Sequence, residues 1–166
     1  MRFGTSTAPN ATGVSSTATK AVGARFSGLS PTRVLDTRTG LGLAGPFTSG
    51  VARTFALAGH GGVPANAVAV TGTVTVTGQT TAGFLSIGPF AATLSRSSVV
   101  NVPVGDARAA GFTVALNGSG PVAAMWTGAG GSKAHVIVDV TGYFLAGATG
   151  STFVPLTPAR LVDTRT

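Results

Sequence analysis

Residues 67–77 alternate between apolar and hydroxyl side chains, and this pattern limits the possible folds of the chain more than any other feature. In an extended strand, successive side chains point to opposite faces, so residues two apart share a face. Four valines and four threonines would then face opposite ways: Val68, Val70, Val74 and Val76 against Thr71, Thr73, Thr75 and Thr77. The alternation predicts a half-buried β-strand that turns its threonines toward solvent.

Further strands are predicted on both sides of this one. They cover residues 32–37, 51–57, 84–87, 98–102, 111–116, 122–126 and 134–144. The 25 Gly and nine Pro fit frequent turns, and no segment carries a sustained helical period. About eight short strands without a helix predict an all-β fold, a two-layer antiparallel β-sandwich or jelly-roll-like domain. Its core should contain the four valines together with Phe112, Val114, Leu116 and Val138.

One stretch of fourteen residues occurs twice. Phe26–Thr39 (FSGLSPTRVLDTRT) recurs as Phe153–Thr166 (FVPLTPARLVDTRT), with eight of the fourteen positions identical and an offset of 127 residues. The second copy retains Phe153, Leu156, Pro158, Arg160, Asp163 and Arg165. The repeat predicts a unit of about 127 residues, followed by the opening strand of a further unit.

The chain divides into three parts on this basis. Residues 1–25 form a low-complexity arm of Ser, Thr, Ala and Gly, residues 26–149 the β-sandwich domain, and residues 150–166 the tail that repeats the opening strand. The arm alone cannot bury enough apolar surface to offset its ordering entropy. We expect the arm, the tail or both to make their main contacts outside their own unit, with other copies of the chain or with adjacent repeat units.

Several segments together resemble a module that is common in secreted proteins of actinobacteria and related bacteria. They are Phe26–Thr39 with its PxRxxDTR pattern, Gly61-Gly62-Val63-Pro64-Ala65, Ala82-Gly83-Phe84-Leu85, and Val138–Phe144 with the closing DVTGYF pattern. In that family the closing pattern is typically followed by another opening pattern. The resemblance implies an extracellular or cell-surface location, although residues 1–30 lack the layout of a signal peptide. It implies an accessory module, often beside hydrolases, with no established activity and no catalytic residues.

Arg33, Asp36 and Arg38 form the most conspicuous group of charged residues. Asp36 and Arg38 share one face of an extended strand, and a guanidinium group can bind a carboxylate through two hydrogen bonds. We expect a structural ion-pair network that fixes a strand end and reaches Asp139, and a ligand-binding site is the alternative. The recurrence at Arg160, Asp163 and Arg165 favours the structural interpretation.

The rest of the sequence offers little for catalysis or cofactors. The chain contains four Asp, no Glu and no Cys. It has no Gly-x-Ser-x-Gly motif and no cluster of residues with metal-ligand spacing, so we expect no enzyme activity, cofactor or metal. The net charge of +7 comes from scattered arginines, without the basic and aromatic runs of a nucleic-acid groove. We therefore predict no nucleic-acid partner, and no segment is apolar over the length of a membrane span.

Three functions from different classes remain, and the third of them, a weakly disguised hydrolase, would require titrating carboxylates clustered in a cleft. The first is a non-catalytic extracellular structural module, a repeat unit or subunit of a surface array or filament whose units join head to tail, in one chain or by strand exchange. The second is a carbohydrate- or cell-wall-binding accessory module attached to a secreted hydrolase, with cell-surface polysaccharide as its partner. Trp126 and Tyr143 could stack on sugars, but Trp126 alternates with Val122 and Ala124, which favours a place in the core.

Overall fold

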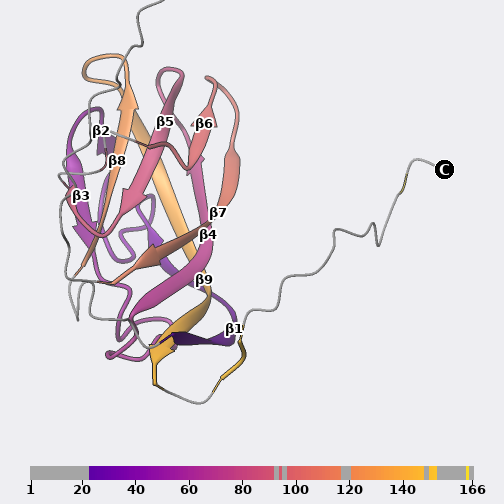
Figure 1. Cartoon of the computed structure of the whole chain (residues 1–166). Coiled ribbons are helices and arrows are strands. Elements are labelled where there is room, and N and C mark those ends of the chain that lie inside the picture. Colours follow the sequence, from indigo (N-terminus) through magenta and orange to yellow (C-terminus); the bar gives the residue numbers. More distant parts are fainter. Residues whose placement is uncertain are drawn as a thin grey trace, which may run out of the picture.

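The protein is a β-sandwich of two antiparallel sheets (Figure 1). The computed structural model describes residues 23–91, 94, 97–116, 121–147, 150–152 and 164. These residues contain nine strands and no α-helix, which confirms the predicted all-β fold. The predicted number of strands was about eight, and the additional strand is the two-residue β2.

The larger sheet has the strand order β1-β9-β4-β7, and β2 pairs with β9 outside this path. Its members are β1 (Ala24–Asp36), β2 (Phe47–Thr48), β4 (Ala69–Thr77), β7 (Arg108–Ala115) and β9 (Lys133–Ala146). The smaller sheet has the order β3-β8-β5-β6. Its members are β3 (Ala52–Phe55), β5 (Gly83–Gly88), β6 (Val100–Val102) and β8 (Val122–Gly128).

Strand β9 lies inside the larger sheet, between β1 and β4. Alternate residues of this strand are fully buried, namely Ala134, Val136, Val138 and Val140. On one side β9 pairs with β4, with Val74 opposite Val138, and on the other it pairs with β1, with Phe26 opposite Phe144. The last strand of the domain therefore joins the first strand to the rest of the sheet.

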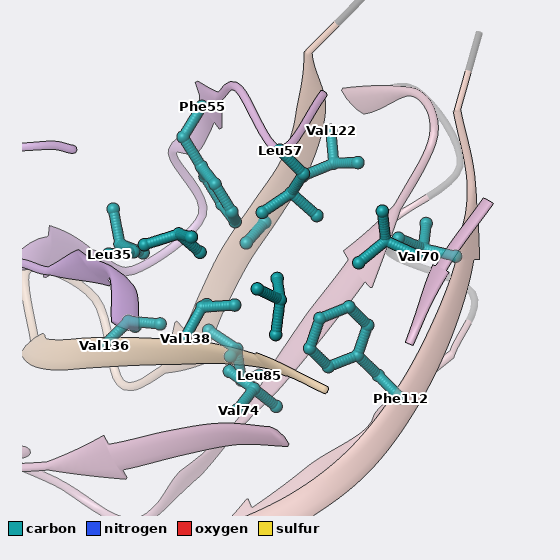
Figure 2. Packing of buried hydrophobic residues seen from close by; sticks show 14 of the residues in the cluster. Leu35, Phe55, Leu57, Val70, Val74, Leu85, Phe112, Val122, Val136 and Val138 are labelled. Carbon is teal, nitrogen blue, oxygen red and sulfur yellow. The ribbon is translucent and has the colours of Figure 1, made fainter. Parts of the chain in front are cut away.

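The core fills the space between the two sheets (Figure 2). Seven of the eight predicted core residues are buried: Val70, Val74, Val76, Phe112, Val114, Leu116 and Val138. The exception is Val68, which lies just before β4 and is only half-buried. Its backbone nonetheless joins the sheet, since its N–H donates to the Phe144 carbonyl and its carbonyl accepts from the Leu116 N–H, both at 2.8 Å.

Strand β1 is longer than the sequence indicated. The predicted strand covered residues 32–37, whereas β1 begins at Ala24, so residues 24 and 25 of the expected arm belong to the sheet. The first half of β1 is mostly exposed and contains Ser and Gly, so it lacks an apolar alternation. Pairing with β9 holds it in place, helped by Phe26 and Phe144, whose ring centroids are 5.4 Å apart.

The chain returns to β1 after β9 ends. Ser151 forms an isolated antiparallel bridge with Phe26, in which each N–H donates to the other carbonyl at 3.0 Å. Gly150–Thr152 therefore lies along the outer edge of β1, the edge that faces away from β9 (Figure 1). The first residues of the predicted tail thus contact their own domain.

Candidate functional site

Asp36 ends β1 and organises the turn that follows it. Its backbone carbonyl accepts hydrogen bonds from the N–H groups of Thr39 (3.2 Å) and Gly40 (3.0 Å). Its carboxylate accepts from the backbone N–H of Arg38 at 3.1 Å, the local bond for which aspartate is favoured in turns. The guanidinium group of Arg38 also binds this carboxylate, through Nε at 2.9 Å and Nη2 at 2.7 Å.

Arg33 connects this turn to strand β9. It lies opposite Asp139 in the register of β1 and β9. Its Nε and Nη2 atoms donate to the two carboxylate oxygens of Asp139 at 2.9 and 3.3 Å, and its Nη1 atom donates to Asp36 at 3.3 Å. The four residues form one continuous network, called here the Arg–Asp cluster (Arg33, Asp36, Arg38 and Asp139), and the predicted contacts among them are present.

The electrostatics of the Arg–Asp cluster follow from this geometry. Asp36 is buried, with 3% of its surface exposed, while the two arginine side chains remain about half exposed. The hydrogen bond from Arg38 holds the pKa of the Asp36 carboxyl well below its usual value, and burial opposes this effect. The hydrogen bond to Asp139 raises the pKa of Arg33, and the bond to Asp36 raises that of Arg38. These shifts favour the charged forms of Asp36, Arg33 and Arg38.

Thr37 and His135 lie at the same end of β1, and the site predicted from the sequence did not include them. Thr37 is buried, and its hydroxyl accepts from the backbone N–H of Val136 at 3.0 Å and lies 3.0 Å from Nδ1 of His135. Its own N–H donates to the Val136 carbonyl at 3.1 Å. The identity of Thr37 and Thr164 in the repeat was the available signal for this side chain.

The other described arginines also donate to protein groups. Arg53 donates to the carbonyls of Ala44 (2.8 Å) and Gly45 (2.6 Å), and its guanidinium lies 5.0 Å from the centroid of the Phe47 ring. Arg108 pairs with Asp106 at 2.7 Å, and Arg25 donates to the Gly150 carbonyl at 3.3 Å. A planar group with five donors suits such multiple contacts better than lysine does. At these positions the positively charged side chains therefore make contacts within the protein.

The remaining predicted site residues are outside the described part of the chain. These are Phe153, Leu156, Pro158, Arg160, Asp163 and Arg165, the assembly strand of the tail.

Two shallow surface pockets lie away from the Arg–Asp cluster. The first has a volume of ≈ 250 Å³ and is lined by Thr77, Gly78, Gln79, Gly105, Asp106 and Ala107. The second has a volume of ≈ 330 Å³ and is lined by Ala82, Gly83, Asn101, Val102, Pro103 and Arg108. Their charged side chains, Asp106 and Arg108, already bind each other. In the first pocket, Gln79 donates to the Pro103 and Asp106 carbonyls, so it holds the adjoining loop.

The described residues contain no group of three or more His, Cys, Asp or Glu side chains that could hold a metal ion. In the same part of the chain there is no helix with the length and apolar character needed to cross a membrane. Comparison of the sequence with models of protein families and with curated proteins finds no match.

Proposed function

We propose that the chain is a non-catalytic extracellular structural module, a unit of a surface array or filament whose units join head to tail. The observation that carries the proposal is the recurrence of Phe26–Thr39 as Phe153–Thr166. Phe26–Asp36 lies within β1, a strand that pairs with β9 along most of its length. A second copy of that strand needs a second β9-like partner for its backbone groups and its apolar side chains. In the described part of the chain β9 already lies between β1 and β4, so we expect another unit to supply this partner.

The Arg–Asp cluster supports a structural role. Three of its four residues belong to the repeated segment, at positions where both copies have the same residue. Within the described unit they join the end of β1 to β9 and fix the following turn. A contact that holds the opening strand to the closing strand is needed once in each unit, which accounts for its recurrence.

The state of the carboxylates supports the absence of catalysis. Asp36, Asp106 and Asp139 are the carboxylate residues of the described part of the chain, and each of them is paired with arginine. The arginine partners lower the pKa values of Asp36 and Asp106, which disfavours the use of these two residues as proton donors at neutral pH. The carbohydrate-binding alternative has less support, since Trp126 is fully buried and donates to Ser132, and Tyr143 packs against the core.

Completion of a second unit tests the proposal. Residues 153–166 repeat residues 26–39, so a chain extended after Thr166 by a second copy of residues 40–166 contains a full second domain. We expect this two-unit chain to show a second set of slowly exchanging amide protons, covering the added strands and residues 153–163. A matched chain in which residues 153–166 are replaced by a Gly/Ser linker of equal length should lack that protection. Equal protection in both chains would show that the tail is not an opening strand.

A further inference from the structure

The outer edge of β1 has an occupant in this structure, the segment Gly150–Thr152. Both backbone groups of Phe26 are hydrogen-bonded to Ser151 at 3.0 Å, and the Arg25 side chain donates to the Gly150 carbonyl at 3.3 Å. Because the offset of the repeat is 127 residues, Gly150, Ser151 and Thr152 correspond to Gly23, Ala24 and Arg25. The residues that open the next unit therefore lie on the first strand of the unit before it.

Gly150 is suited to this close approach. Its φ of 148° lies in the region that L side chains rarely adopt, and a Cβ atom there would lie 2.8 Å from the Phe26 carbonyl oxygen. Such a distance is too short for any ordinary carbon–oxygen contact, so the segment must move if a side chain is present. The bridge to β1 explains why glycine occupies this position.

Gly23 is equivalent to Gly150 in the repeat, but its surroundings in its own unit do not explain why glycine occupies the position. A Cβ atom built on Gly23 meets nothing within 4 Å, and its φ is not among the positive values. Nothing in the described part of its own unit requires glycine there. A contact of Gly23 with a preceding β1, of the kind that Gly150 makes with this β1, would supply such a requirement.

We infer that consecutive units are joined through the outer edge of β1, where Gly23–Arg25 of each unit pairs antiparallel with Phe26 of the unit before it. The partner is thus a second copy of this unit, and the inference rests on the proposed function. The contact supplies backbone hydrogen bonds to an otherwise open strand edge, the mode of recognition known as β-strand addition. It also places consecutive units in a defined register, because a single bridge between Phe26 and Ser151 sets which residues face each other.

A disulfide tests the contact in the two-unit chain described above. In the antiparallel register set by Phe26 and Ser151, Arg25 lies opposite Thr152 in a position without hydrogen bonds, where Cα atoms are about 4.5 Å apart. This separation is within the reach of a disulfide, and the natural chain has no Cys. We expect Arg25→Cys with Thr152→Cys to oxidise to an intramolecular disulfide, detected as a loss of two hydrogen masses. The control pair, Ser30→Cys with Thr152→Cys, lies about 17 Å farther along the strand and should keep free thiols.

Alanine at the two equivalent glycines provides the second measurement. Gly150→Ala, in the same two-unit cysteine variant, should slow disulfide formation because it displaces the segment from Phe26. Gly23→Ala should leave the rate unchanged, since no unit precedes Gly23 in that chain. A folded second unit without the disulfide, or equal effects of the two alanines, would overturn the inference while leaving the proposed function in place. A second unit that fails to fold would overturn the proposed function and this inference with it.

Discussion

The short side chain of Asp36 allows its carboxylate to bind the turn that follows β1. An aspartate can accept from the backbone N–H two residues later, as it does from Arg38, and glutamate is one methylene too long for that contact. The same carboxylate then orients both Arg33 and Arg38. Its removal leaves two guanidinium groups near each other and a backbone N–H without its acceptor.

We therefore expect Asp36→Asn to lower the melting temperature of the protein. The amide keeps the size of the side chain but loses the negative charge and one acceptor, so the turn and the β1–β9 junction weaken. Asp106→Asn is the matched control, because Asp106 is about half exposed in its pair with Arg108, and such surface pairs contribute little. Thermal unfolding followed by circular dichroism measures both changes. Similar melting curves for Asp36→Asn and the natural protein would show that the Arg–Asp cluster is not structural.

The lowered pKa of Asp36 also predicts how stability changes with pH. Its carboxyl is more acidic in the folded protein, chiefly because Arg38 donates to it, than in the unfolded chain, where the usual value is about 3.9. The folded state is therefore favoured above that pH and loses this contribution as the pH falls below it. We expect the melting temperature to fall steeply below about pH 4, and less steeply in Asp36→Asn. Parallel slopes for the two proteins would assign the acid sensitivity to other groups, such as Asp106, whose pKa is also lowered.

At the scale of elements, the close approach of neighbouring strands explains two glycines in the sequence motifs, Gly142 and Gly83. Gly142, in the DVTGYF pattern, lies beneath the Phe26 ring, and a Cβ atom there would be 2.6 Å from Cζ of that ring. Gly83, in the Ala82–Leu85 segment, faces Trp126 in the same manner, with 2.6 Å to its Cζ2 atom. These motifs thus include positions where an aromatic ring covers the backbone of a neighbouring strand.

Substitution of Gly142 tests this role. Gly142→Ala should displace the Phe26 ring and increase amide exchange in the first half of β1, residues 24–28, while the β4–β7 pairing keeps its protection. Gly111→Ala in β7 is the control, because a Cβ atom there meets only the Gly72 carbonyl oxygen at 3.9 Å, an ordinary contact. Phe26→Ala combined with Gly142→Ala should restore part of the packing between the strands. Unchanged exchange at residues 24–28 in Gly142→Ala would contradict the prediction.

The elements that the sequence predicted are those with their own hydrophobic period. The Val/Thr alternation identified β4, and a similar period in residues 134–144 identified β9. By contrast, β2 has two residues and no period, and its position depends on the burial of Phe47 beneath the Arg53 guanidinium. The first half of β1 also lacks a hydrophobic period, so the sequence did not predict it. It forms a strand because it pairs with β9 and because the Phe26 ring packs on Gly142.

The Arg–Asp cluster was predictable to the extent that its residues lie near each other in sequence. Charge matching suggested Asp139. Spacing predicted that Asp36 and Arg38 share a face of an extended strand, which was wrong, because β1 ends at Asp36 and Arg38 lies in the following turn, where its backbone N–H and its guanidinium both bind the Asp36 carboxylate. The contacts of Thr37 with Val136 and His135 depend on the register of β1 and β9, which spacing alone does not determine.

For the whole molecule, the tail should determine whether copies associate. The full chain should form larger species at high concentration, because Phe153–Thr166 can add to the sheet of another copy. A chain ending at Thr152 should stay monomeric while retaining the Ser151–Phe26 bridge and the same circular dichroism spectrum. Analytical ultracentrifugation and electron microscopy distinguish the two outcomes. A full chain that sediments as a monomer at every concentration would exclude assembly by strand exchange.

The position of β9 has a consequence for the order in which the domain folds during synthesis. The strand that separates β1 from β4 is the last to leave the ribosome, so the larger sheet stays incomplete until almost the whole unit has been made. Pairing between the two ends of a domain is a contact of high sequence separation, which slows folding. In a row of such units, each domain would close only as its final strand emerges, immediately before the opening strand of the next one. Folding would then proceed one unit at a time from the N-terminus, and a nascent unit would not have its own β9 available to exchange with a neighbour.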